Sequence, residues 1–187
     1  MEFKTNINRE NCVGCFACAQ ACKRKCISAE RDELGFLFPK FDASLCIDCG
    51  LCASVCPANG KSLSNISAHI VDKAYSAVSK DKRILKASSS GGAFSAIVSE
   101  FCDDDTLIFG AKFGENFSAG IDCVKGVKNI APFRGSKYIQ AYSTDSFKKA
   151  AEFLKGGSRV LYSGTPCQIA ALRLFLKKDY ENLLTVD

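Results

Sequence analysis

The chain has 187 residues, of which 47 % are apolar and 24 % charged, so it can bury the core of one or two small domains. The net charge of +5 is uneven: residues 1–60 hold seven basic and seven acidic side chains, so residues 61–187 carry the whole excess. This excess fits an anionic cofactor or substrate as well as an ordinary basic surface. Basic and aromatic residues are not interleaved, so we expect no nucleic acid partner.

Cysteine is the most unusual feature of the composition, with twelve residues, nine of them between positions 12 and 56. Such a chain is either a secreted disulfide scaffold or an intracellular metal protein. The first residues, MEFKTNINRE, contain no apolar signal-peptide core, and no run of 18 apolar residues exists that would span a membrane. We therefore expect a cytoplasmic protein whose clustered thiols are reduced and bind metal.

The clustered cysteines form an internal repeat. The pattern C-x2-C-x2-C-x3-C occurs twice, 34 residues apart, at Cys12, Cys15, Cys18 and Cys22 and again at Cys46, Cys49, Cys52 and Cys56. Four thiolates within eleven residues suit a [4Fe-4S] cubane, whose irons each take one thiolate, whereas zinc ribbons space their cysteine pairs more widely. The single histidine, His69, lies outside both copies. We predict two [4Fe-4S] clusters, with zinc as the alternative.

In two-cluster ferredoxins the fourth cysteine of each motif ligates the other cluster. The expected ligands are Cys12, Cys15, Cys18 and Cys56 for the first cluster, and Cys46, Cys49, Cys52 and Cys22 for the second. Gly14 and Gly50 are expected to bring backbone N–H groups close to the sulfides. Cys26 has no counterpart, because Gly60 stands 34 residues later, so we expect an unligated filler near the clusters.

The residue after the fourth cysteine is Pro57 in the second copy but Lys23 in the first. The basic run 23–25 would raise the potential of the cluster held by Cys22, mark a docking face for an acidic partner, or form only a solvated turn. Between the copies, RDELGFLFPKFD predicts a hairpin that packs three aromatic residues against the clusters: Phe36, Phe38 and Phe41. Residues 1–62 thus resemble the bacterial dicluster ferredoxin fold.

The second part of the chain begins with a predicted linker or start of a connecting helix at 61–71, followed by a predicted strand at 74–79. The Ser/Gly loop 88–92 then precedes apolar residues at helical spacing, namely Phe94, Ile97, Val98 and Phe101. Such a loop at a helix N-terminus presents free N–H groups to an anion such as phosphate, although SSSGG also makes an ordinary helix start.

Strands and helices then alternate, which indicates an α/β domain with a parallel or mixed sheet. The expected elements are strands at 106–113, 121–127, 158–164 and 182–186 and helices at 146–155 and 165–178. The last helix begins with a capping box formed by Thr165 and Gln168, with Pro166 at its first position. Cys167 falls in its first turn, where a lowered thiol pKa would suit a nucleophile or a metal ligand; the alternative is a small buried residue.

Three segments in this order, SSSGGAFSAIV, RGSKYIQAY and VLYSGTPCQIAALRLFL, resemble the coenzyme F420 hydrogenase/dehydrogenase β-subunit family. Many members carry a dicluster ferredoxin domain in front. The resemblance implies an α+β protein with a ferredoxin-like domain at 1–62 and an incomplete α/β flavin-type domain at 63–187. It implies that Cys167 ligates a third cluster beside the flavin. The implied FAD contacts are Ser89, Ser90, Gly91, Gly92, Gly135, Ser136, Lys137 and Tyr138.

Members of this family are iron–sulfur flavoproteins that exchange electrons with a two-electron carrier, coenzyme F420 in the founding cases. They continue past NLLTVD, whereas this sequence stops at Asp187, so we expect a truncated flavin domain and leave Cys102 and Cys123 as buried thiols. The predicted function is an oxidoreductase that passes electrons between a redox partner protein or subunit, two clusters and a flavin. The alternatives are a non-enzymatic ferredoxin-like carrier with a docking domain and a zinc-stabilised interaction module.

Overall fold

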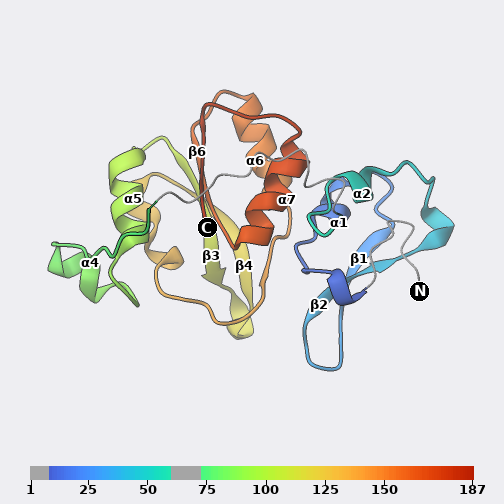
Figure 1. Ribbon diagram of the computed structural model, residues 1–187, viewed down its shortest axis with the longest axis horizontal. Helices are drawn as coiled ribbons and strands as arrows, with labels where there is room; N and C mark the ends of the chain where they lie inside the picture. Colours follow the sequence, from blue (N-terminus) through green and yellow to red (C-terminus); the bar gives the residue numbers. More distant parts are fainter. Residues whose placement is uncertain (1–8, 60–72) are drawn as a thin grey trace.

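The computed structural model describes residues 9–59 and 73–187 (Figure 1). The first stretch, which we call the cysteine-rich region, lies beside the second, which we call the α/β region. The predicted linker at 61–71 and the predicted domain boundary at residue 62 fall outside the described residues. Within the described part of the chain, no helix is long and apolar enough to cross a membrane.

The cysteine-rich region contains only short elements. They are the 3-10 turns η1 (Arg9–Asn11) and η2 (Ala43–Leu45), helices α1 (Ala17–Ala21) and α2 (Leu51–Ser54), and strands β1 (Ile27–Arg31) and β2 (Leu37–Phe41). The two strands pair antiparallel, with Ile27 opposite Phe41, which confirms the predicted hairpin. Helices of five and four residues are too short to be stable alone, so contacts outside each helix must hold them in place.

The three aromatic residues expected against the clusters have different surroundings. Phe36 follows the hairpin turn and is 51 % exposed. Phe38 packs beneath the Arg9 guanidinium, 4.7 Å from the ring centroid. Phe41, by contrast, lines a cavity together with five cysteines.

The two cysteine loops share an unusual backbone conformation at equivalent positions. Gly14 and Phe16 in the first loop have φ of 62° and 58°, and Asp48 and Gly50 in the second have 57° and 72°. Glycine adopts this left-handed region freely, while other residues do so at a cost. Both copies of the repeat thus follow the same chain path. Glycine occupies the first of the two left-handed positions in the first loop and the second in the other loop.

The α/β region is built on one mixed five-stranded sheet. Its strands are β3 (Leu107–Phe113), β4 (Ala119–Lys125), β5 (Ala141–Tyr142), β6 (Val160–Ser163) and β7 (Leu183–Val186), in the order β5-β4-β3-β6-β7. β3 and β4 form an antiparallel hairpin, whereas β3 with β6, β6 with β7 and β4 with β5 run parallel. The connections include 3-10 turns at Glu115–Phe117, Val127–Asn129 and Ala131–Phe133.

Helices cover both faces of this sheet (Figure 1). Helix α5 (Ala93–Phe101) lies on one face, with α4 (Lys82–Lys86) before it, and α6 (Ser146–Lys155) and α7 (Pro166–Leu176) lie on the other. The predicted helices and strands of residues 106–186 are confirmed within a few residues. The capping box of α7 is also present, since the Thr165 N–H donates to the Gln168 Oε1 at 3.0 Å.

The core follows from strand alternation, because neighbouring residues of a strand point to opposite faces. On the α5 side, Ile108 and Leu161 are fully buried against Val98. On the other side Phe109 stacks on Tyr162, with ring centroids 5.2 Å apart, and Phe147 packs at 5.8 Å from the same tyrosine. Burial on both faces explains why the central residues of β3 and β6 form continuous apolar runs rather than alternating ones.

Two expectations for the α/β region are wrong. The strand predicted at 74–79 is absent, and residues 73–78 are exposed throughout. Cys102 and Cys123 are only partly buried, since each stands at an edge of the core.

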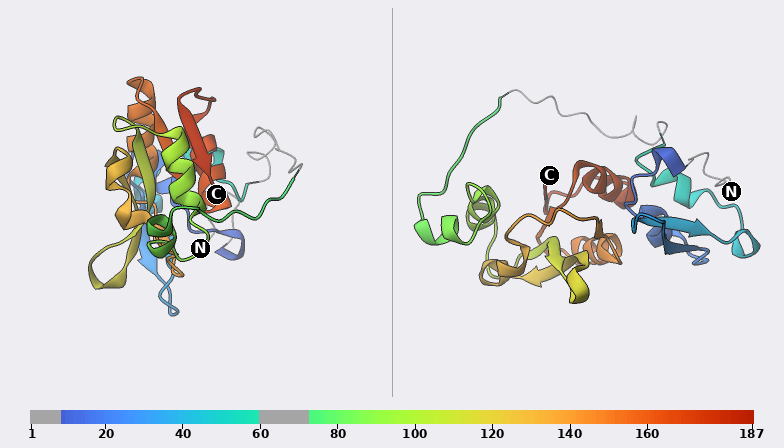
Figure 2. Two further views of the ribbon diagram at one scale, coloured as in Figure 1. Left: turned by 90° about the vertical axis from the view of Figure 1, so that its left-hand side faces the viewer. Right: turned by 90° about the horizontal axis from the view of Figure 1, so that it is seen from below.

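The two regions share one core and a set of buried hydrogen bonds. α1 packs against α6 and α7, where the two regions lie side by side (Figure 2). Cys15, Ala17 and Val55 belong to the same apolar cluster as Phe147. The first cysteine loop is therefore part of the interior of the molecule, not an appendage of it.

Gln20 makes the central polar contact of this interface. Its Oε1 accepts the Phe147 N–H at 3.0 Å at the start of α6, whose own N-cap residue, Asp145, makes no capping bond. Its Nε2 donates to Ser143 Oγ at 3.0 Å, and that hydroxyl donates to the Cys15 carbonyl at 2.6 Å. The first cysteine motif thus caps a helix of the α/β region, which fixes the loop that carries Cys15.

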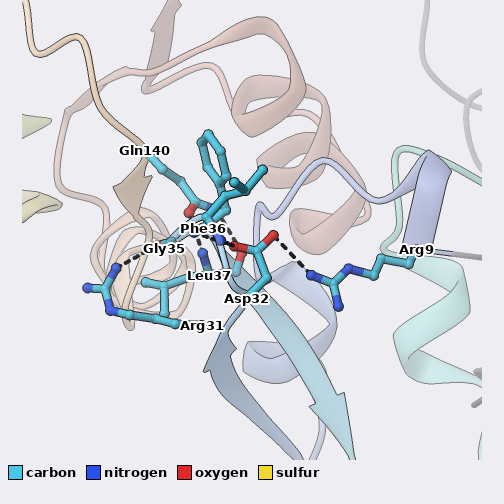
Figure 3. A network of polar contacts seen from close by, with 8 residues as sticks. Arg9, Arg31, Asp32, Gly35, Phe36, Leu37 and Gln140 are labelled. Carbon is cyan, nitrogen blue, oxygen red and sulfur yellow. Dashed lines mark hydrogen bonds and ion pairs between the residues drawn. The ribbon is translucent and has the colours of Figure 1, made fainter.

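A second clamp joins the hairpin to the α/β region (Figure 3). The Gln140 side chain accepts the Leu37 N–H at 2.7 Å and donates to the Leu37 carbonyl at 2.8 Å, so its amide pairs with the strand as a neighbouring backbone would. The Asp32 carboxylate closes the hairpin turn by accepting the N–H groups of Leu34 and Phe36, and Arg9 pairs with it at 3.0 Å.

Candidate metal centre and adjoining cavity

The thiols of the cysteine-rich region fall into two groups, each drawn from both copies of the repeat. The first group lies against the α/β region. Burial raises the pKa of Cys15 to about 12, and the nearby thiols of Cys56, Cys167 and Cys12 raise it further. Burial is also the main cause of the raised pKa of Cys18, to which Cys15, Cys12 and Cys56 add. The members of this group are Cys12, Cys15, Cys18 and Cys56.

The second group lines a cavity of about 260 Å³, which we call the thiol cavity. Its cysteines are Cys22, Cys26, Cys46, Cys49 and Cys52, and the apolar side chains beside them are Ile27, Phe41, Ile47 and Leu51. The Asp48 N–H lies 3.3 Å from the Cys46 Sγ, a contact that the left-handed φ of Asp48 permits. Cys26 is 5 % exposed, whereas Cys49 is open to solvent.

The fourth cysteine of each motif accepts backbone hydrogen bonds from the residues that follow it. Burial alone would raise the pKa of Cys22, but the Cys26 thiol and the N–H groups of residues 24–26 lower it. Cys56 receives the corresponding N–H groups of Ala58 and Asn59, although burial leaves its pKa raised. The donors stand two and three residues after the cysteine in both copies, so the exchange of Pro57 for Lys23 leaves this arrangement intact.

The donor set fits iron–sulfur clusters. Within the described ranges, no three His, Cys, Asp or Glu side chains are arranged to hold a single metal ion. A cubane does not need such convergence, because each of its irons takes one thiolate. Cysteine ligates iron as the thiolate, and burial raises the pKa of the Cys15 and Cys18 thiols, so cluster insertion at neutral pH releases their protons.

A larger cavity of about 750 Å³, which we call the Ser/Gly cavity, lies beside the first thiol group. It opens beyond the carboxyl ends of the parallel strands β6 and β7, where open α/β sheets place their ligands. One wall belongs to the first cysteine loop, through Val13 and Gly14. The opposite walls include Ser89, Ser90, Gly92, Gly135, Ser136, Lys137 and Cys167.

The polar groups of the Ser/Gly cavity are fixed by hydrogen bonds between its loops. The Ser89 hydroxyl lies 3.0 Å from the Ser136 hydroxyl and accepts the Ser136 N–H at 3.1 Å. Arg134 donates to the buried Ser95 hydroxyl at 3.0 Å, and Lys137 donates to the Arg134 carbonyl at 2.8 Å. Burial lowers the pKa of Lys137. The two cations and the N-terminus of α5 make this wall suited to an anion.

Two residues expected near a flavin do not line the Ser/Gly cavity. Gly91 is not part of the cavity lining, and its carbonyl accepts the Ser79 N–H at 2.7 Å. Tyr138 is 93 % exposed and borders a different cavity, of about 740 Å³, between the two hairpins. Cys167 does line the Ser/Gly cavity, with its sulfur 3.1 Å from the Thr165 hydroxyl. Its role as a cluster ligand stays a prediction.

Sequence reasoning missed the residues that join the two regions. Gln20 is the one polar residue of α1, ACAQA, and that isolated polarity is the only local signal it gives. Gln140 and Ser143 flank the two-residue strand β5, and nothing near them in the sequence indicates a partner more than 100 residues away.

Comparison with known proteins bears on the cysteine-rich region. Residues 11–60 match the family of 4Fe-4S dicluster domains. An uncharacterised ferredoxin of Methanocaldococcus jannaschii is 34 % identical over 53 residues, which cover 28 % of this chain and 68 % of that protein. The family match falls on the part of the chain that carries the repeated cysteines.

Proposed function

We propose that this chain, which belongs through residues 11–60 to the dicluster ferredoxin family, passes electrons to or from an FAD in the Ser/Gly cavity. Members of that family carry electrons on two [4Fe-4S] clusters. The chain would then act as an iron–sulfur flavoprotein oxidoreductase that resembles the F420 hydrogenase/dehydrogenase β subunits. One observation carries the proposal: the cysteine loop of the first thiol group forms a wall of that cavity.

We assign the cluster ligands by the crossed pattern. The first cluster takes the group next to the α/β region and the second takes four thiols of the thiol cavity. Because the first group adjoins the Ser/Gly cavity and Cys49 is open to solvent, the second cluster would receive electrons from a redox partner and the first would face the flavin. The ligand sets are Cys12, Cys15, Cys18 and Cys56, and Cys46, Cys49, Cys52 and Cys22.

The flavin assignment rests on the size and chemistry of the Ser/Gly cavity. Bound FAD would supply the exchange between one-electron and two-electron steps. Arg134 and Lys137 offer positive charge to its phosphates, and the loop at Gly92 offers N–H groups at the start of α5. We propose Ser89, Ser90, Gly92, Gly135, Ser136 and Lys137 as contacts, and leave out Gly91 and Tyr138.

A third cluster at Cys167 would need three more thiolates. Among the described residues that line the Ser/Gly cavity, Cys167 is the one cysteine. We therefore propose no complete third site within the described part of this chain, and place Cys167 beside the flavin instead.

The test is the cofactor content after anaerobic purification and reconstitution with FAD. We expect about eight irons and eight acid-labile sulfides per chain, as two cubanes require, and one FAD. Lys137→Ala should weaken FAD binding several-fold and leave iron unchanged. Lys128→Ala, which removes an exposed cation paired with Asp104 outside the cavity, is the matched control. Full iron with no bound FAD would leave the ferredoxin-like electron carrier as the function.

Electron transfer is tested by rapid mixing of the loaded protein with a one-electron donor. We expect cluster reduction to be followed by flavin reduction. Flavin that stays oxidised while the clusters remain reduced would contradict the proposed route. Reduced coenzyme F420 as donor then tests the two-electron carrier: flavin bleaching supports it, and its absence removes F420 from the proposal without affecting the clusters.

A further inference from the structure

The thiol cavity contains five cysteines, one more than a cubane binds. Cys26 lies 3.2 Å, sulfur to sulfur, from Cys22, and its thiol also interacts with Cys46. Cys26 is almost fully buried and lines the same cavity as the other four. It therefore stands at the ligand position of Cys22 rather than at a separate position in the cavity wall.

The local chain path explains how two cysteines reach one position. Cys22 ends α1, and the Lys25 N–H then donates to the Cys22 carbonyl at 3.1 Å, which closes a tight turn. Lys25 adopts the left-handed region, with φ of 53°, and directs the chain back towards the cavity. The Cys26 carbonyl accepts the Asp42 N–H at 2.8 Å, so the β1–β2 hairpin anchors the second thiol independently of the first.

Two sulfurs this close cannot ligate two different irons of one cubane, because the thiolates of a cubane point outward from separate corners. Two adjacent thiolates would also repel each other. One of the pair must therefore be a thiolate ligand while the other remains a protonated thiol beside it.

We propose that Cys22 and Cys26 are interchangeable ligands of the second cluster, with Cys22 bound and Cys26 held in reserve as a thiol. Exchange of the two roles moves one proton from Cys26 to Cys22, replaces one iron–thiolate bond by another, and changes no oxidation state. The inference rests on the proposed ligand sets and is independent of the flavin. It gives the second cluster a replacement ligand should Cys22 be lost or oxidised.

The experiment compares single and double substitutions by iron content and by the electron paramagnetic resonance of the reduced clusters. Cys22→Ala should keep about eight irons per chain, with altered resonance of one cluster, because Cys26 becomes the ligand. Cys26→Ala should also keep about eight, since Cys22 remains. The double variant should keep about four. Loss of about four irons in Cys22→Ala alone would overturn the proposal.

Cys49→Ala is the matched control, because it removes a thiol of the same cavity that is exposed to solvent. It should lose about four irons. If Cys49→Ala keeps about eight irons, the proposed ligand sets are wrong. This outcome is distinct from the one that would overturn only the exchange between Cys22 and Cys26. If Cys22→Ala does not fold, the Cys22→Ser variant is compared with the double variant Cys22→Ser/Cys26→Ala. We expect the two to differ in their resonance lines, because Cys26 is the ligand in the first and absent from the second. Identical lines would overturn the proposal.

Discussion

The two regions of this molecule are held together by different forces. In the α/β region, rings and branched side chains such as Phe109, Phe147 and Leu161 are completely buried between the sheet and its helices. The cysteine-rich region has helices of five and four residues, a two-stranded hairpin and few buried apolar side chains. A region this small usually needs metal or disulfides to supply what its core lacks. Its clusters are therefore structural as well as redox groups.

The comparison extends into the cysteine repeat itself. Phe16 is buried and packs edge-on to Tyr142 at 4.6 Å, while the equivalent Gly50 is exposed. Gln20 is buried in the interface, while the equivalent Ser54 faces solvent. Two copies with the same thiol spacing thus have different surroundings: the first is anchored by the α/β region, and the second depends more on its cluster.

Removal of both clusters gives the largest expected effect. Anaerobic oxidation and chelation of iron should unfold much of the cysteine-rich region and leave the α/β region folded, because only the latter has a core of its own. Amide hydrogen exchange before and after removal measures this, with residues 46–56 losing protection first. Equal loss of protection in the strands of the sheet would contradict the contrast between the regions.

Phe147→Ala should destabilise the α/β region, whereas removal of the clusters unfolds the cysteine-rich region. The ring is fully buried against Tyr162 and Phe175, so its loss should lower the free energy of unfolding of the α/β region by about 3–5 kcal/mol. Phe117→Ala, at a ring that is 84 % exposed, should change it by less than about 0.5 kcal/mol. Denaturant unfolding followed by far-ultraviolet circular dichroism checks both values. A small effect at Phe147 would show that the core tolerates the cavity.

Gln20→Ala tests the joint between the regions. The substitution leaves the Phe147 N–H without its acceptor and removes the donor to the buried Ser143 hydroxyl, which keeps only its bond to the Cys15 carbonyl. This should cost about 1–3 kcal/mol. Ser54→Ala removes an exposed hydroxyl at the equivalent position of the second copy, which donates to the Leu51 carbonyl. It should cost less than about 0.5 kcal/mol. The difference between the two variants in denaturant midpoint measures the anchoring. Equal effects would mean that both copies are held alike.

The raised pKa of Tyr162 predicts a smaller effect on the free energy of unfolding, which is confined to alkaline pH. Burial raises the pKa of this phenol above its usual value of about 10. Below pH ~10 the phenol is protonated in both states; at higher pH the unfolded chain ionises while the folded one resists, so stability falls. Tyr162→Phe should show a shallower decline of unfolding free energy between pH ~10 and ~11 than the unsubstituted protein. The same slope in both would remove Tyr162 as the cause.

Several features follow from the sequence alone because they depend on residues close together in the chain. The capping box places Thr165 and Gln168 within one helical turn, and the apolar runs of β3 and β6 are strands buried on both faces. The first three cysteines of each copy are separated by only two residues. This spacing places their thiols side by side in one loop. Such short-range geometry leaves the chain few alternatives.

Tertiary structure decided the rest, because the partners involved are far apart in the sequence. Residues 74–79 have strand-like composition but no neighbouring strand, so they stay irregular. Gln20 becomes a helix cap only because α6, more than 120 residues later, begins against it. Cys26 has no place in the repeat, yet the turn after α1 and the β1–β2 hairpin bring its sulfur to that of Cys22. Sequence alone determined which groups can bind iron, whereas folding determined which of them stand side by side.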